Sequence, residues 1–209
     1  MGNKISRKDF LLGSAIGAAT LAFGQVPVFA EEEAASFNAT SEEGLTNVDI
    51  SSMKSLEADV AVIGGGGAGL SAAIAAAEAG KSVMLMEKIG FLGGTTMLSS
   101  GIIPATGTQE QIDFGVTDDS VGANARDILR PSNYSVRQEL VYTVAEKAKD
   151  MVDWLRGMGV KWTLMNSLFY GQSEYRMHQA EGSGAGMTKV MIDYLGSFEN
   201  VTSVVNTKV

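Results

Sequence analysis

The feature that most constrains this chain of 209 residues is a glycine-rich turn between an apolar run and an alanine-rich segment. Residues 60–63 form a short unbroken apolar run, which is typical of a strand buried on both faces of a parallel sheet. Gly64, Gly66 and Gly69 then give the pattern G-x-G-x-x-G. The alanine-rich segment at 68–79 predicts a helix that starts at this turn.

The glycines of this turn have separate mechanical roles in a dinucleotide site. The first allows the tight turn, the second lets the backbone approach a pyrophosphate, and the third lets the helix pack close to the strand. The free N–H groups and the positive end of the helix then stabilise an anion together. Residues 82–86 predict the next strand, and Glu87 follows at the ~20-residue distance at which an acidic side chain binds a ribose. The whole unit predicts a dinucleotide site rather than glycines that only ease helix packing.

Composition and charge exclude several other functions. The chain is 45% hydrophobic and 19% charged, which is ordinary for a globular protein. Its formal net charge of -8 argues against nucleic acid as a partner, because binding phosphates requires basic residues. The chain has no cysteine, so it has no disulfide, no thiolate metal site and no attachment site for c-type haem, and we predict no metal site. Redox chemistry therefore requires a non-covalent organic cofactor or a partner.

Residues 1–30 predict an export signal peptide. Lys4, Arg7 and Lys8 precede an apolar run at 10–23, and small residues follow it. The segment around Arg7 and Lys8 is similar to a twin-arginine export motif with lysine in place of the second arginine. The run is short for a ~20-residue membrane span, although an N-terminal anchor stays open as the alternative. We expect no stable membrane anchor and an exported protein, in the periplasm or on the outer face of the cytoplasmic membrane.

The rest of the chain divides into a linker and a domain. Residues 31–57 are rich in Glu, Ser, Ala and Thr without an apolar period, which predicts a flexible linker. Residues 58–209 form the predicted dinucleotide-binding domain. Beyond the first unit, the patterns predict a polar turn region at 109–120, helices at 121–129, 136–155 and 187–195, and a strand at 201–205.

The longest predicted helix has a start signal and a stop signal. Ser135 and Gln138 form a capping-box signature, and apolar residues recur at helical spacing from 136 to 155. Gly157 and Gly159 are suitable helix ends. We expect this helix to be a scaffold that packs on the sheet.

A second glycine-rich region follows the first unit directly. Residues 90–101 read G-F-L-G-G-T-T-M-L-S-S-G and have no helical or strand period. Glycines let a backbone come close to a flat or anionic ligand, and hydroxyl groups can donate hydrogen bonds to it. From local composition alone, an ordinary irregular loop is an equally good interpretation.

Together these motifs resemble the flavoprotein subunit of the fumarate reductase and succinate dehydrogenase family, above all its soluble flavocytochrome-c-type branch. The resemblance rests on V-I-G-G-G-G-A-G-L at 62–70, M-E-K at 86–88 and the segment at 90–101, and it runs from about Asp59 to the end of the chain. It implies an α/β, Rossmann-like FAD/NAD(P)-binding domain with a mostly parallel sheet, and FAD as the cofactor. It also implies an incomplete fold in which the substrate or capping domain is absent.

The resemblance assigns cofactor contacts to particular positions. The first glycine turn would bind the pyrophosphate, the acid after the second strand the adenosine ribose, and the second glycine region the ribityl chain and flavin. The positions are Gly64, Gly66, Ala68, Gly69, Glu87, Lys88, Gly94, Thr95, Thr96, Ser100 and Gly101. Thr95 stands where the family has asparagine, so that a hydroxyl replaces an amide. His178 is similar to a family histidine near the flavin, whereas a lone histidine by itself indicates a structural role.

The resemblance implies an exported FAD-dependent oxidoreductase that reduces a small unsaturated carboxylate such as fumarate. An external protein or domain would donate the electrons. The proton donor and the carboxylate-binding groups of the family lie downstream of the matching segment, so we assign no catalytic residue and expect a truncated chain. Two alternatives stay open. One is a non-catalytic flavin-binding or electron-carrier module, and the other is an NAD-dependent dehydrogenase, which leaves the second glycine region unexplained.

Overall fold

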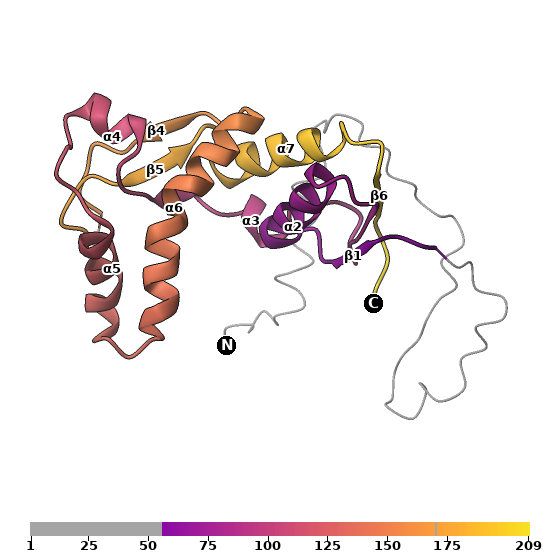
Figure 1. Cartoon of the computed structure of the whole chain (residues 1–209), viewed down its shortest axis with the longest axis horizontal. Coiled ribbons are helices and arrows are strands. Elements are labelled where there is room, and N and C mark those ends of the chain that lie inside the picture. Colours follow the sequence, from indigo (N-terminus) through magenta and orange to yellow (C-terminus); the bar gives the residue numbers. More distant parts are fainter. Residues whose placement is uncertain (1–55, 170) are drawn as a thin grey trace, which may run out of the picture.

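The computed structural model describes residues 56–169 and 171–209. In this part of the chain, two small sheets lie at either end of a layer of helices (Figure 1). The signal peptide predicted at 1–30 and nearly all of the linker predicted at 31–57 lie outside the described residues.

The first sheet is parallel and contains the predicted unit. Its strands are β1 (Val60–Ile63), β2 (Val83–Met86) and β6 (Val201–Val204), in the order β1-β2-β6. The helix α2 (Gly67–Glu78) connects β1 to β2 and starts at the glycine turn. This arrangement confirms the predicted parallel α/β architecture.

One face of the first sheet is covered and the other is not. The register pairs Val62 with Leu85, and both pack in a core with α2 and with α7 (Ser183–Leu195). On the opposite face, Ile63 is 67% exposed. The prediction that 60–63 is buried on both faces is therefore wrong for the described residues, because α2 and α7 lie on the same side of the sheet.

The second sheet is antiparallel, and the sequence patterns do not predict it. Its strands are β3 (Ile102–Pro104), β5 (Met177–Ala180) and β4 (Trp162–Leu164), in the order β3-β5-β4. The long helix α6 (Gln138–Met158) packs against one face of this sheet through Val152. The strands have three or four residues each, too few to show a clear period of two.

Two short helices lie between β3 and α6. The first, α4 (Gln109–Phe114), lies in the region that was expected to be a polar turn, so that expectation is wrong. Thr108 explains the helix, because its hydroxyl accepts a hydrogen bond from the N–H of Gln111 at 3.2 Å and so caps the first turn. The helix α5 (Val121–Leu129) has the predicted bounds and is followed by the 3₁₀ turn η3 (Arg130–Ser132). Figure 1 shows α5 and α6 as a hairpin that projects from the second sheet.

The start of α6 differs from the prediction, whereas its end at Gly159 agrees. The hydroxyl of Ser135 donates to the carbonyl of Ser132 at 2.6 Å, and the N-cap residue Arg137 makes no side-chain cap, so the predicted capping box is wrong. The helix continues through Gly157, so the prediction that this glycine stops it is wrong, and it ends at Gly159, whose φ of 113° is left-handed. Among the helices of the described residues, none has both the length and the hydrophobicity that a membrane span needs.

Candidate cofactor-binding site

The two glycine-rich regions lie side by side. The N–H of Gly93 donates to the carbonyl of Gly65 at 2.7 Å, and a parallel bridge joins the two segments. The N–H of Gly67 donates to the hydroxyl of Thr96 at 3.1 Å. The short helix α3 (Gly94–Met97) therefore starts directly beside the start of α2. The two regions can contribute to one binding site, as the sequence indicated.

Two of the glycines are required by the close approach of backbone segments. A Cβ atom on Gly69 would lie 1.7 Å from the carbonyl oxygen of Gly64. Gly94 has a φ of 53°, and a Cβ atom there would lie 2.9 Å from the Cα of Gly66. In front of the turn the space is open, since a Cβ on Gly64 would meet no atom within 4 Å and one on Gly66 would meet only the Cα of Gly94, at 3.9 Å.

The first turn presents backbone donors to this open space. Among the described residues, no acceptor is found for the N–H groups of Gly66, Ala68 and Gly69. The start of α2 adds the partial positive charge of a helix N-terminus, and no acidic side chain lies in its first turn. A diphosphate has the negative charge and the acceptor atoms that match these donors.

Glu87 lies buried behind the turn and is 7% exposed. Its carboxylate accepts hydrogen bonds from the N–H of Gly65 at 2.7 Å and from the N–H of Ile89 at 3.0 Å. These bonds anchor the glycine turn to the end of β2 and offset the loss of hydration of the buried carboxylate. Each carboxylate oxygen has a further lone pair, and the ribose contact of Glu87 remains a prediction.

The remaining predicted positions fall into two groups. Thr95 and Thr96 lie on α3, beside the first turn, and Thr95 is exposed. Ser100 is exposed, and Gly101 is buried against the start of α7. Lys88 is exposed after β2. Thr95 and Thr96 thus lie next to the first glycine turn, and Ser100 and Gly101 lie further along the second glycine region. The cofactor contacts of all these positions remain predictions.

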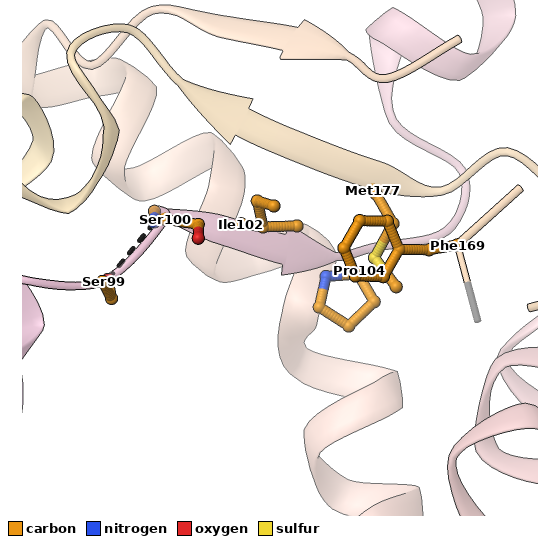
Figure 2. A pocket seen from close by; sticks show the side chains of 7 residues that line it. Ser99, Ser100, Ile102, Pro104, Phe169 and Met177 are labelled. Carbon is orange, nitrogen blue, oxygen red and sulfur yellow. Dashed lines mark hydrogen bonds between the residues drawn. The ribbon is translucent and has the colours of Figure 1, made fainter. Parts of the chain in front are cut away.

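A cavity of about 350 Å³ lies beyond the second glycine region (Figure 2). It is lined by Ser99, Ser100, Gly101, Ile102, Pro104, Phe169 and Met177. The register pairs Pro104 with Met177, so both side chains face the cavity from one side of the second sheet. The sequence patterns indicate Ser100 and Gly101 but miss Phe169 and Met177, because no motif marks them and only the folding of the second sheet brings them here.

A buried ion-pair network holds the segment before β5. Arg176 is fully buried, and its guanidinium donates to Asp119 at 2.5 Å, to Asp127 at 2.5 Å and to the side-chain oxygen of Gln172 at 2.9 Å. Burial disfavours the charged guanidinium, but the hydrogen bonds to the two carboxylates outweigh it and raise the pKa of Arg176 above its ordinary value. The network is structural, and no sequence motif predicts it, because the partners are 57 and 49 residues away in the chain.

His178 lies on the face of the second sheet opposite the cavity. Its neighbour Met177 faces the cavity, and side chains alternate along a strand. The Nδ1–H of the buried imidazole donates to the carbonyl of Arg176 at 2.8 Å, so Nε2 accepts from the hydroxyl of Thr108 at 2.7 Å. Burial is the main cause that lowers the pKa of His178, so the ring is neutral at pH 7. These contacts favour the structural role over a position next to the cofactor.

The parallel unit, the glycine turn at a helix start and the acid after the second strand define an α/β domain of the dinucleotide-binding class. Residues 59–205 match the family described as the FAD binding domain, and the chain belongs to this family. FAD is therefore its cofactor, and the NAD alternative loses its support.

Several of the proteins similar to this chain are named as reductases. A urocanate reductase of Eggerthella lenta is 36% identical over 154 residues, which cover 73% of this chain and 25% of that protein. A fumarate reductase (cytochrome) of Shewanella frigidimarina is 35% identical over 138 residues, which cover 65% of this chain and 24% of that protein. The open conformation of a flavocytochrome c3 fumarate reductase matches with a TM-score of 0.66 and 30% identity, over 77% of this chain and 28% of that chain. The chain thus spans about a quarter of the length of these relatives.

The described residues fit FAD. The open space and the free N–H groups of the first turn match its diphosphate, and the second glycine region continues from that point to the cavity. The site therefore has a part lined by backbone donors that suits the diphosphate, and an uncharged part along the second glycine region.

Proposed function

We propose that this chain provides the FAD-binding function of an exported flavin-dependent reductase that acts on a small unsaturated carboxylate. The observation that carries the proposal is the contact between the two glycine regions, in which the N–H of Gly93 donates to the carbonyl of Gly65 at 2.7 Å. This contact makes the two regions one continuous candidate site. Two of the relatives are a urocanate reductase and a fumarate reductase. Urocanate and fumarate both carry a carbon–carbon double bond conjugated to a carboxylate.

When bound, FAD supplies the hydride chemistry that a reduction of this kind requires. The chain's own residues bind and orient it. We assign the diphosphate to the N–H groups of Gly66 and Ala68, the ribose to Glu87 and the flavin end to the segment 94–101. Burial of Glu87 and its two backbone hydrogen bonds fix the shape of the turn before the cofactor arrives.

We assign no proton donor to this chain. Arg176 and His178 are both buried, and hydrogen bonds within the protein hold both side chains. A substrate therefore needs groups from elsewhere for its proton and for its carboxylate. Electrons come from another protein or domain in this proposal, since the chain has no cysteine to attach a haem.

The binding part of the proposal is tested by incubating the purified chain with FAD, removing free cofactor by gel filtration and recording the visible spectrum. We expect bound flavin in the wild-type chain. Gly94→Ala should lower the occupancy, because its Cβ would lie 2.9 Å from the Cα of Gly66. Gly157→Ala is the matched control, because a Cβ there meets no atom within 4 Å. A folded wild-type chain without flavin would contradict the proposal.

The export and substrate parts need separate measurements. Mass spectrometry of the extracytoplasmic fraction should find a mature protein that starts near Glu31, and full-length protein confined to the cytoplasm would contradict export. Reoxidation of the reduced, FAD-loaded protein by fumarate or urocanate under anaerobic conditions, together with the part that supplies the proton donor and the carboxylate-binding groups, tests the reductase. Bound flavin that neither compound reoxidises would leave the flavin-carrier alternative.

A further inference from the structure

We propose that His178 and Thr108 form a proton-sensitive latch that holds α4 on the second sheet, and that protonation of the histidine releases this helix. The latch lies on the face of the second sheet opposite the cavity, in a part of the molecule that the proposed cofactor site does not use. It makes the order of α4 depend on the pH around the protein.

One hydroxyl group joins the helix to the histidine. Thr108 is the N-cap residue of α4, and its hydroxyl oxygen accepts a hydrogen bond from the N–H of Gln111 at 3.2 Å. The same hydroxyl donates to Nε2 of His178 at 2.7 Å, because the other ring nitrogen donates to the carbonyl of Arg176 at 2.8 Å. Thr108 and His178 are fully buried, so bulk water does not replace either bond. The neutral ring thus fixes the hydroxyl that caps the helix.

Protonation of the ring breaks this arrangement. It turns Nε2 from an acceptor into a donor, so the Thr108 hydroxyl must rotate to accept from it. The hydrogen of the hydroxyl then loses its buried acceptor, and the imidazolium carries a charge where water does not hydrate it. Both effects disfavour the closed arrangement, in which α4 is capped and packed on the sheet.

The elements around the ring supply no free counter-charge within the part of the chain that the structure describes. Glu110 of α4 brings a carboxylate oxygen to 3.9 Å from Nε2 of His178. Arg156 of α6 already binds both oxygens of that carboxylate, at 2.8 Å and 2.6 Å, and is itself a cation facing the ring. The strands β3 and β4 on either side of β5 contain no ionisable side chain. The other charged groups nearby pair among themselves, Arg176 with Asp119 and Asp127, and Asp153 with Lys149 and Arg156.

The helix has little else to hold it. The structure describes every residue of α4, and among them Gln111 is the buried one. Ile112 and Phe114 are 53% and 43% exposed. The side chain of Gln111 adds polar contacts, to Asp119 at 2.9 Å and to the carbonyl of Tyr175 at 2.8 Å. Segments with few buried apolar contacts open locally before the whole domain unfolds, so a change at the cap acts first on α4.

The direction of the pH effect follows from the surroundings of the ring. Burial is the main cause that lowers the pKa of His178, and the carboxylate of Glu110 offsets it only in part. The released histidine, with an ordinary pKa of about 6.5, therefore binds protons more readily than the latched one. The contribution of the latch is present above about pH 6.5. It is lost as the pH falls through the lowered pKa of the folded state.

Hydrogen exchange of the tag-free, ¹⁵N-labelled chain tests the latch. The probes are the amides of Gln111 and Ile112, which bond to the hydroxyl and to the carbonyl of Thr108. Rates are converted to protection factors, which removes the intrinsic pH dependence of exchange. Between about pH 7.5 and about pH 5.5 we expect these factors to fall by about tenfold, the change that a released group with a pKa of about 6.5 produces. The amides of β2, the central strand of the first sheet, report global unfolding and should stay better protected.

His178→Gln is the matched variant, because its amide keeps a donor and an acceptor but does not titrate. The protection of α4 in this variant should be independent of pH over the same range. A fall of the same size in the variant would overturn the latch. Wild-type α4 amides that lose no protection, or that exchange only together with β2, would overturn it as well.

A measurement on the wild-type chain decides the inference if the variant does not fold. The chain has one histidine, so its ring signals are unambiguous. We expect the ring ¹⁵N signals to show a protonated Nδ1 and a bare Nε2 at about pH 7.5. On acidification they should titrate with the same midpoint as the amides of Gln111 and Ile112. A ring that gains its proton while these amides stay in place would contradict the latch.

Discussion

Replacing Gly69 with alanine tests whether the close approach of α2 to the first strand shapes the site. The new Cβ would lie 1.7 Å from the carbonyl oxygen of Gly64, whereas ordinary contacts start at 3.4 Å, so the two atoms must separate by 1.7 Å (3.4 − 1.7). The obstacle is backbone, which cannot rotate away as a side chain can. The helix must therefore move off β1, and the fully buried Leu70 and Ile74 on the same helix lose part of their packing.

The expected loss follows from two opposing effects. Overpacking in a close-packed region costs about 1–3 kcal/mol, and alanine gains up to about 1 kcal/mol over glycine inside a helix. These bounds leave a fall in the free energy of unfolding of about 0–3 kcal/mol, centred on about 1–2 kcal/mol, which urea denaturation measures. Because the N–H of Ala68 moves with the helix start, FAD affinity in calorimetry should also fall by about tenfold or more.

Gly157→Ala is the control for the Gly69 variant. It lies on the exposed side of α6, and a Cβ there meets no atom within 4 Å, so stability should be unchanged or slightly raised. A Gly69→Ala protein that unfolds at the wild-type urea concentration and binds FAD with the wild-type affinity would refute the reasoning.

Two further predictions concern the buried network. Arg176→Met leaves Asp119 and Asp127 buried without their cation, so it should lower the free energy of unfolding by about 3–5 kcal/mol. Arg137→Met removes an exposed ion pair and should change the free energy of unfolding by less than about 0.5 kcal/mol. Urea denaturation of both variants measures the difference. Burial raises the pKa of Asp127, but hydrogen bonds from Ser173 and Arg176 outweigh this effect and hold the pKa below its ordinary value. The contribution of this carboxylate to the free energy of unfolding is therefore present above about pH 4. It is lost as the pH falls through the lowered pKa of the folded state. Urea midpoints measured from pH 6 to pH 3 should fall less steeply in Asp127→Asn, and a parallel fall in both proteins would contradict this assignment.

The first unit was predictable because its signals are local. The strand, the glycine turn, the helix and Glu87 follow each other within thirty residues, and Gly69 has a steric reason to be there. The contact between the two glycine regions was a weaker inference, since local composition does not show where a loop lies. The family resemblance supplied it, and the hydrogen bond between Gly93 and Gly65 agrees with it.

The second sheet and the cavity were not predictable from local patterns. Their strands are short, and β5 pairs on one side with β3, which precedes it far along the chain. The cavity residue Phe169 has no neighbour in sequence that marks it. Arg176 likewise gives no signal, because its two carboxylate partners come from separate segments.

The long helix shows the limit of periodicity in another way. The apolar spacing correctly predicts a helix, but it does not tell which apolar residues are buried. Small residues such as Ala145 and Ala148 face the core, because they allow close packing, whereas Leu140 and Val144 are 52% and 55% exposed. The apolar arc of α6 is wider than the surface that the described residues cover.

The central claim is that both glycine regions bind one FAD molecule. The most direct measurement is a titration of the ¹⁵N-labelled chain with FAD, followed through its backbone amide signals. The account predicts that the amides of Gly66 and Ala68 in the first region and of Gly94 and Thr95 in the second shift together in one saturable process with a stoichiometry of one. Shifts confined to one region, or different affinities for the two, would contradict it.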